Sequence, residues 1–245
     1  MKRIALLFLA ASAALPAPAR VLIVADEIPA MEVLAARLKT GAKVECTVVE
    51  QKAMPARLYP FDTLIVYVHR DLDAKVERAS IDFAQGGGKL ILLHHSISSN
   101  KRKNQEWFPF LGVRLDEGDV SAGGYKWIEG VEWEMVNLAP KSAITTQGVE
   151  YPATVAYRGE RKPAFQLDDS EVYLNHHLSG PRTILLGLQF KDPKTGVEYQ
   201  QDTAGWYRRA GKGWVMYFMA GHSVKEFGNP AYARILVNAV RAKLR

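Results

Sequence analysis

The chain has 245 residues, of which 48% are hydrophobic, 24% charged and 10% aromatic. This balance excludes a disordered or fibrous protein, and the length suits one α/β domain, with or without an insertion, rather than two full cores. The formal charge of +6 raises the question of an acidic partner such as nucleic acid or a membrane surface. Cys46 is the only cysteine, which excludes an intramolecular disulfide and a zinc site built on several cysteines.

Residues 1–19 have the pattern of a secretory signal peptide. Lys2 and Arg3 precede an apolar run over 4–15, and Ala17-Pro18-Ala19 supplies small residues where a signal peptidase reads them. The run is shorter than the ~20 residues that span a bilayer, so a retained anchor is the weaker alternative. Cleavage after Ala19 leaves about 226 residues with a formal charge of +4. We therefore expect a periplasmic or secreted protein without an integral membrane segment, and the smaller charge no longer argues for nucleic acid.

The first part of the mature chain alternates strands and helices. Its continuous apolar runs are typical of strands that are covered on both faces in a parallel sheet. Pro29 begins a helix that Gly41 ends, and Asp73 caps a second helix. Gly86-Gly87-Gly88 ends that second helix and precedes a strand, whereas a phosphate loop would follow a strand and open a helix. The predicted strands are 21–25, the segment around Cys46, 64–68 and 89–93.

The middle of the chain has a different pattern. From Gly112 to about Gln189 there is no helical period, and short β-like segments predominate. Regular order returns with an apolar run over 214–220 and a final helix that begins at Asn229-Pro230. The sequence therefore predicts an α/β fold, a doubly wound and mostly parallel sheet with an antiparallel β extension.

Polar residues follow several of the predicted strands directly, namely Asp26, His69, His94 and His222. Ligands of open α/β sheets bind beyond the carboxyl ends of the strands, and neutral imidazoles there bind metals or transfer protons. The simpler interpretation is that these histidines only stabilise strand ends. Because neighbours in a strand point to opposite faces, only one of His94 and His95 is expected to face a site, and we choose His94.

Two other features have a simple structural interpretation. Lys101-Arg102-Lys103 is expected to be a solvated loop rather than a nucleic-acid surface, because no basic and aromatic surface surrounds it. Trp127 and Trp206 can stack on the apolar face of a sugar ring, although tryptophans of α/β proteins more often pack in the core.

Several motifs follow one another along the chain: Gly86 to His94, Ser170-Glu171-Val172-Tyr173, Trp206, Gly211 to Gly213, Val215 to Tyr217 and Gly221-His222. In this order they resemble the trehalose-utilisation (ThuA-like) family, and the resemblance covers the chain from the strand at Val21 to the final helix. It implies an α/β fold of the class I glutamine amidotransferase-like type, related to the flavodoxin-like arrangement, without the amidotransferase cysteine. His94-His95-Ser96 stands where that cysteine would be, so a glutamine amidotransferase is not expected.

The resemblance also implies site residues. His94, Glu171 and His222 match recurring polar residues of the family, and Tyr173 and Trp206 match aromatic ones. The chain departs from the family at Ser170, where an aspartate is common, with Asp168 and Asp169 just upstream as substitutes. It also departs at the loop from Leu111 to Tyr125, which has no histidine here.

The first functional hypothesis is an exported carbohydrate-active enzyme, a hydrolase or an isomerase, with a small-molecule carbohydrate as its substrate. His94, Glu171 and His222 would hold a divalent metal, zinc or similar, with a water in the open position. Without a metal, Glu171 would be the general base and a histidine the acid in a hydrolysis, isomerisation or proton transfer. The residues assigned to substrate binding are Asp26, His69, Tyr173 and Trp206.

The second hypothesis is a non-catalytic sugar-binding or accessory protein that keeps an enzyme fold. The missing cysteine, Ser170 and the loop without histidine favour it, and a fold alone does not decide activity. The sequence leaves the substrate, the metal and a homo-oligomeric state open.

Overall fold

The structure, a computed structural model, describes residues 19–244. The predicted signal peptide lies outside the described residues except for Ala19. No helix of the described part of the chain is long and apolar enough to cross a membrane.

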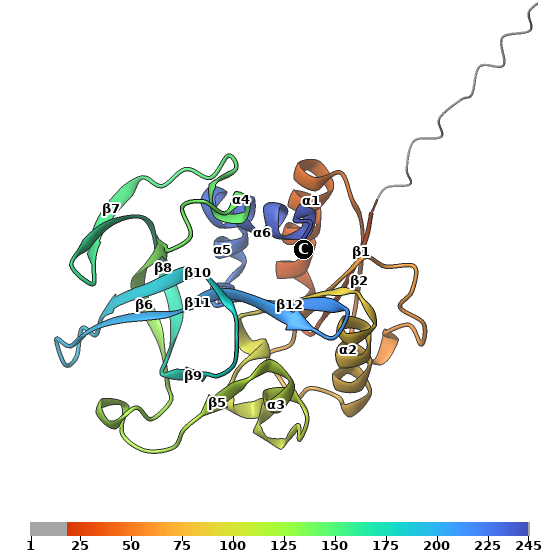
Figure 1. The fold of residues 1–245 in the computed structure, drawn as a ribbon, viewed down its shortest axis with the longest axis horizontal. Helices are drawn as coiled ribbons and strands as arrows, with labels where there is room; N and C mark the ends of the chain where they lie inside the picture. The colour runs from red at the N-terminus through yellow and green to blue at the C-terminus, as the bar shows by residue number, and fades with distance from the viewer. Residues whose placement is uncertain (1–18, 245) are drawn as a thin grey trace, which may run out of the picture.

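A ten-stranded sheet forms the centre of the molecule, in the order β2-β1-β3-β4-β12-β11-β10-β6-β8-β7 (Figure 1). The first five strands are parallel, and their order is that of flavodoxin-like folds, with β12 as the fifth strand. The predicted doubly wound parallel sheet is therefore confirmed. These strands are β1 (Arg20–Ala25), β2 (Glu45–Val49), β3 (Thr63–Tyr67), β4 (Lys89–Leu93) and β12 (Gly213–Phe218).

The predicted antiparallel extension continues the same sheet beyond β12. Burial alternates along β7 and the middle of β6, as expected of strands with one solvated face, whereas β8, β10 and β11 contain continuous buried runs. Its strands are β6 (Lys126–Asn137), β7 (Ala153–Tyr157), β8 (Glu160–Leu174), β10 (Thr183–Lys191) and β11 (Glu198–Ala210); β5 (Val113–Leu115) and β9 (His176–Leu178) form a separate two-stranded sheet.

Helices cover the parallel strands on both sides (Figure 1). On one side α1 contacts α5 and α6, and α4 contacts α6; on the other, α2 packs on β4 and β12 and contacts α3. The α-helices are α1 (Ile28–Ala42), α2 (Ala74–Gly86), α3 (Trp107–Leu111), α4 (Ala143–Thr146), α5 (Val224–Gly228) and α6 (Pro230–Arg241). Short 3-10 turns are η1 (Gln51–Ala53), η2 (His94–Ser96), η3 (Ser99–Lys103) and η4 (Val120–Ala122).

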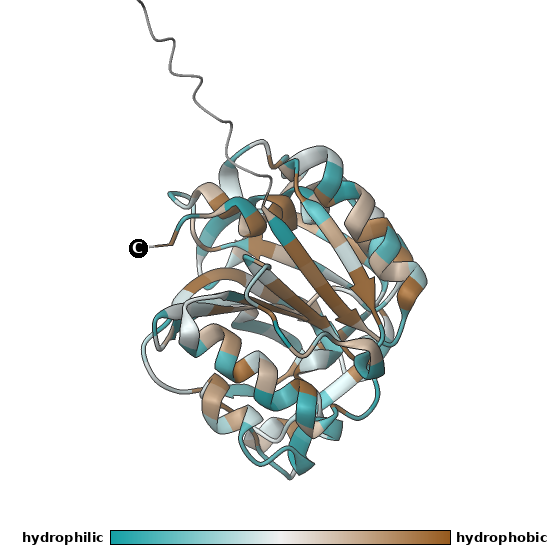
Figure 2. Ribbon diagram, turned by 90° about the vertical axis from the view of Figure 1, so that its right-hand side faces the viewer, coloured by the Kyte–Doolittle hydropathy of each residue, from teal (hydrophilic) through white to brown (hydrophobic). Residues whose placement is uncertain are grey.

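The main hydrophobic core is built from the parallel strands and these helices and continues into β6, β8, β10 and β11; strands of the sheet are brown in Figure 2, whereas the helices carry both teal and brown. Gly87 ends α2 at φ 123°, as its sequence context predicts. Gly41 does not end α1: a Cβ there would lie 2.9 Å from Cγ2 of Val237, so this glycine allows α1 and α6 to approach. The helix ends instead at Ala42, and the C-cap residue Lys43 is left-handed.

Candidate functional site, a buried histidine–carboxylate cluster

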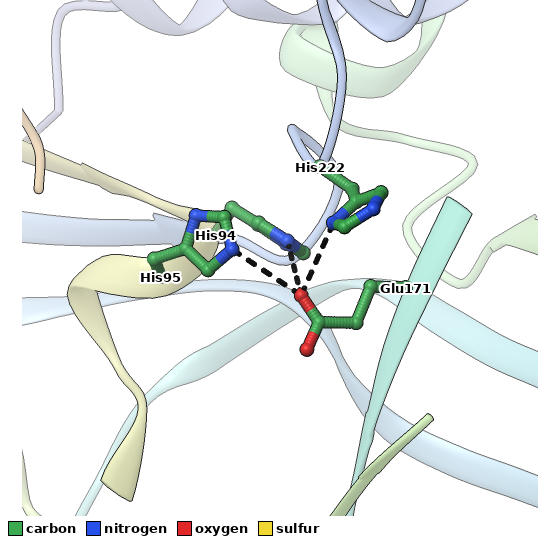
Figure 3. Close-up of side chains that lie close together, drawn as sticks. All are labelled: His94, His95, Glu171 and His222. Atoms are coloured by element: carbon green, nitrogen blue, oxygen red, sulfur yellow. Dashed lines mark hydrogen bonds and ion pairs between the residues drawn. The ribbon is translucent and has the colours of Figure 1, made fainter. Parts of the chain in front are cut away.

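Four side chains converge beyond the carboxyl ends of the parallel strands: His94, His95, Glu171 and His222 (Figure 3). His94 and His95 follow β4, and His222 follows β12 after a short turn. Glu171 comes from β8, in the antiparallel extension. The cluster, which we call the His/Glu cluster, therefore joins the two halves of the sheet.

The two adjacent histidines both face Glu171, with Nε2–Oε2 distances of 2.9 Å for His94 and 3.3 Å for His95. The expectation that only one of them would face a site assumed that the strand continues through both. The strand ends at Leu93 instead, and His94 begins the 3-10 turn η2 with a left-handed φ of 44°. A tight turn does not place neighbouring side chains on opposite faces, so sequence alternation misses His95.

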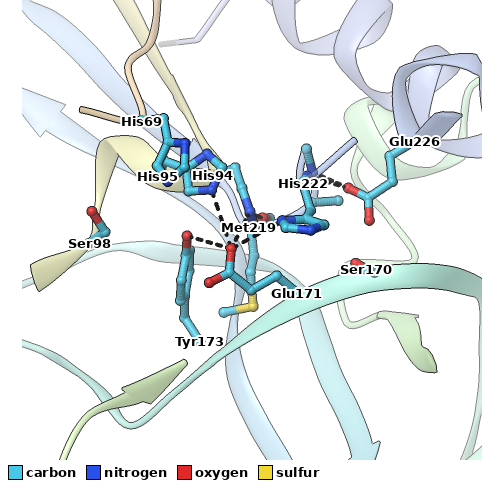
Figure 4. Close-up of polar contacts among 12 residues, drawn as sticks. His69, His94, His95, Ser98, Ser170, Glu171, Tyr173, Met219, His222 and Glu226 are labelled. Atoms are coloured by element: carbon cyan, nitrogen blue, oxygen red, sulfur yellow. Dashed lines mark hydrogen bonds and ion pairs between the residues drawn. The ribbon is translucent and has the colours of Figure 1, made fainter. Parts of the chain in front are cut away.

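Glu171 is the centre of the cluster. Its Oε2 lies 3.3 Å from His222 Nδ1 and also accepts a hydrogen bond from the Tyr173 hydroxyl at 3.1 Å (Figure 4). Burial would raise the pKa of Glu171, but hydrogen bonds from His222, His94 and His95 outweigh it and hold that pKa well below its usual range. Glu171 is thus a buried carboxylate anion surrounded by imidazoles.

The same contacts affect the histidines in opposite ways. Burial, helped by neighbouring His94, lowers the pKa of His95 to about 3, so this ring is neutral near pH 7. The hydrogen bond to Glu171 raises the pKa of His222, which is less buried. The cluster therefore has one neutral ring, with one N–H donor and one lone pair, and one ring that readily takes a proton.

Backbone contacts fix the orientation of His94 and His222. His94 Nδ1 lies against the Met219 carbonyl oxygen, which can only accept, so Nδ1 carries a proton. The Glu226 carboxylate accepts from the backbone N–H groups of Gly221 and His222 (Figure 4). Gly221 has a φ of 134°, and a Cβ there would lie 3.1 Å from His94 Cβ, so glycine permits this close approach.

The tautomer of His94 bears directly on what the cluster can bind. With Nδ1 protonated, the neutral ring presents an Nε2 lone pair to the anionic oxygen of Glu171 only 2.9 Å away. Two lone pairs at that distance need a cation, either a proton on His94 or a metal ion held in common. A backbone carbonyl that fixes the second ring nitrogen is also the usual support of a metal-binding histidine.

The remaining predicted site residues have different positions. His69 lies beside the cluster, stacked on His95 with ring centroids 3.9 Å apart. The Asp26 carboxylate accepts hydrogen bonds from the backbone N–H groups of His69 and Arg70, at 2.9 and 2.7 Å, so it holds the segment after β3 in place. Trp206 is fully buried against Tyr217 and cannot offer a face to a sugar.

Ser170, the departure from the family pattern, points away from the cluster. It is fully buried and accepts a hydrogen bond from Trp133 Nε1 at 2.7 Å. The upstream Asp169 is exposed and faces Lys225 at 3.5 Å. Neither residue can supply a ligand to the cluster.

Sequence reasoning also missed Lys101. The sequence predicts a solvated loop, but Lys101 is fully buried. Its Nζ donates hydrogen bonds to the carbonyl oxygens of His69 and Arg70, at 2.9 and 2.8 Å. Burial lowers the pKa of Lys101 to about 8. No local pattern marks it, since the two carbonyls come from a distant loop. Lys101 thus positions His69 through the backbone carbonyl of that residue.

A second set of ligand atoms, from Glu27, His69 and His95, also lies within 4.8 Å of one another. The rings of His69 and His95 are nearly parallel, at 17°. Lone pairs of imidazole lie in the ring plane, so stacked rings do not direct them at one point. The His/Glu cluster, whose ligand atoms also lie within 4.8 Å, is therefore the better candidate for a metal site.

The fold and the cluster together define the class: a flavodoxin-like α/β protein with a buried histidine–carboxylate centre at the carboxyl ends of its strands. The chain belongs to the ThuA (trehalose utilisation) family, whose profile matches residues 20–241. No curated protein sequence matches it significantly.

Solved structures show the same fold. A putative ThuA-like protein from Bacteroides uniformis is 17% identical, with a TM-score of 0.64 over 94% of this chain and 93% of that one. The carbohydrate deacetylase Agd3 (10% identity, TM-score 0.56) and a β-galactosidase from Bacillus circulans sp. alkalophilus (10%, 0.54) each match 91% of this chain. The match spans only 32% and 30% of those two proteins, respectively.

Proposed function

We propose that this protein is an exported carbohydrate-active enzyme in which His94, His95, Glu171 and His222 hold a divalent transition metal. The convergence of three imidazole nitrogens on one buried, ionised carboxylate oxygen carries the proposal. Membership of the trehalose-utilisation family supports a sugar or sugar derivative as the substrate.

The donor set fits a borderline metal such as zinc, iron or nickel, because imidazole nitrogen suits these ions. A bound metal would act as a Lewis acid and lower the pKa of a water that attacks or deprotonates the sugar. The residues in and around the cluster would orient the metal ligands and neutralise part of the charge of the ion. Met219 fixes the His94 ring, Glu171 supplies a negative charge, and the Tyr173 hydroxyl holds the carboxylate in place.

The number of ligands favours a second candidate function, a non-catalytic sugar-binding or accessory protein. Four protein ligands complete the tetrahedral shell of a structural zinc ion, whereas catalytic zinc sites keep one position open. An enzyme built on this centre would need a position left for water or substrate beside the four side chains.

Metal analysis of the purified chain, followed by sugar turnover, tests the proposal. We expect one divalent ion per chain, lost in His94→Ala and Glu171→Gln but retained in His177→Ala, whose side chain is exposed and outside the cluster. Product formation from trehalose or other sugars by the metal-loaded protein would favour the enzyme. Tight sugar binding without product would favour the accessory protein, and an unaltered metal content in the cluster variants would overturn both.

Export is part of the same proposal. Lys2-Arg3, the apolar run and Ala17-Pro18-Ala19 support it. Expression of the full chain in a bacterial host should yield a periplasmic or secreted form that begins at Arg20. A cytoplasmic form with residues 1–19 intact would contradict export.

A further inference from the structure

The His/Glu cluster opens into two adjoining hollows. The inner hollow, of about 170 Å³, is lined by His69, His95, Glu171, His222 and other residues, and the outer one has about 480 Å³. Both are bounded by Ser99, Tyr125 and Trp127. The inner volume is below the range of pockets that take a drug-sized ligand, so it suits one small unit, and the two together reach that range.

Trp127 stands where the two hollows meet. It is 49% exposed, unlike the buried Trp107, Trp133 and Trp206. In the pairing of β6 with β8 it lies opposite Tyr173, so its side chain is on the same face of the sheet as the cluster. An exposed indole beside a polar pocket is a flat surface on which the apolar face of a sugar ring can rest.

Glu129 lies on the same strand and the same face. It is opposite Glu171 in the β6–β8 pairing and lines the inner hollow. Its side chain is exposed, and within the described residues no hydrogen bond or ion pair engages it. Glu171, by contrast, is engaged by the cluster through its Oε2. Glu129 is thus a carboxylate free to accept hydrogen bonds from sugar hydroxyls.

The outer hollow has the polar lining that a second sugar unit needs. Charged side chains of both signs surround it, which can donate to and accept from hydroxyl groups. They come from η3, from the segment directly after β5 and from the start of β6: Arg102, Asp116, Glu117 and Lys126.

We propose that the pocket binds a glycan of at least two sugar units, with the inner unit between Glu129 and the His/Glu cluster, the outer unit beside Arg102 and Asp116, and Trp127 stacking at their junction. This inference rests on the proposed carbohydrate function and adds to it the size of the ligand and the residues that recognise it. A ligand with one unit would fill only the inner hollow and leave Trp127 largely unused.

Calorimetric titration of the metal-loaded full chain with D-glucose, trehalose, maltose and cellobiose tests this inference. At least one disaccharide should bind tenfold or more tightly than glucose. Trp127→Ala should remove most of that difference, and Arg102→Gln should weaken only the disaccharide. Glu129→Gln should weaken glucose and disaccharide alike. Tyr59→Ala, which removes an exposed aromatic outside both hollows, and Glu132→Gln should leave both affinities unchanged.

Three results would overturn the inference: glucose binding as tightly as every disaccharide, unchanged disaccharide affinity in Trp127→Ala, or no binding of any of the four sugars while the metal is bound. Metal analysis of the same samples separates the failures. A chain that binds metal but not these sugars contradicts the two-unit pocket and leaves the metal centre standing. A chain without metal contradicts the proposed centre first.

Discussion

At the scale of single residues, the cluster consists of one buried carboxylate and the imidazole rings that surround it. Glu171 remains ionised inside the protein because imidazoles on three sides stabilise it. Its neighbour Ser170 faces the opposite side of β8, against Trp133. A strand that alternates its faces thus gives the two adjacent residues unrelated roles.

Ser170→Asp, which restores the residue common in the family, should destabilise this protein. The new carboxylate would be fully buried with one neutral donor, the Trp133 indole, so we expect a loss of roughly 2–4 kcal/mol in the free energy of unfolding. Urea unfolding measures it, with Asp169→Asn as the exposed control. Equal stability of Ser170→Asp and the parent would show that the burial argument is incorrect.

The burial of His176 predicts how the free energy of unfolding depends on pH. This histidine is buried among Tyr125, Tyr173 and Tyr217, neither ring nitrogen has a partner within the described residues, and burial lowers its pKa to about 3. Between pH 6.5 and 3 the unfolded chain binds a proton that the folded chain excludes, so the free energy of unfolding falls as the pH falls. Above pH 6.5 this contribution is fully present.

The variant His176→Phe removes that proton uptake. Its free energy of unfolding should drop less between pH 7 and pH 4.5 than that of the parent, by roughly 1–3 kcal/mol. Urea unfolding with a chelator present at both pH values measures the difference, and His177→Gln is the exposed control. Parallel pH curves for His176→Phe and the parent would rule out this role.

At the scale of elements, one side chain joins the start of β4 to the end of α6. Lys89 Nζ donates to the carbonyl oxygens of Ala239, Val240 and Ala242, at 3.1, 2.7 and 2.7 Å. These are carbonyls that the last turn of a helix leaves without partners, and a cation there also complements the helix dipole.

Lys89→Met should therefore fray the end of α6 and lower the free energy of unfolding by about 1–3 kcal/mol. Hydrogen exchange should report faster exchange over the last turn of α6, whereas Lys75→Met, on the exposed side of α2, should change neither. Unchanged exchange in α6 would mean that the contact does not hold the helix.

Much of the fold could be predicted from the sequence, because both halves of the sheet have local signals. Continuous apolar runs mark β1, β3, β4 and β12, and the loss of helical period marks the antiparallel strands. The site was predictable only where a residue follows a strand or matches a family motif, as His94, Glu171 and His222 do. His95, Lys101 and Glu129 depend on a 3-10 turn, a distant pair of carbonyls and a cross-strand register, none of which a local pattern shows.

At the scale of the whole molecule, the cluster unites two parts of one sheet. The parallel half supplies three histidines, and the antiparallel half supplies Glu171 and Trp127, which lines the adjoining hollow. A metal bound only by the folded chain would therefore stabilise both halves together, by an amount that grows with the logarithm of its free concentration.

Zinc titration of the chelator-treated chain tests the central claim most directly, with calorimetry for stoichiometry and thermal unfolding of the same samples. We expect one ion per chain and a rise in Tm, with both lost in Glu171→Gln and retained in Glu129→Gln. No saturable binding of zinc, or of cobalt, iron or nickel in its place, or the same binding and Tm rise in Glu171→Gln, would contradict a metal centre built on the His/Glu cluster.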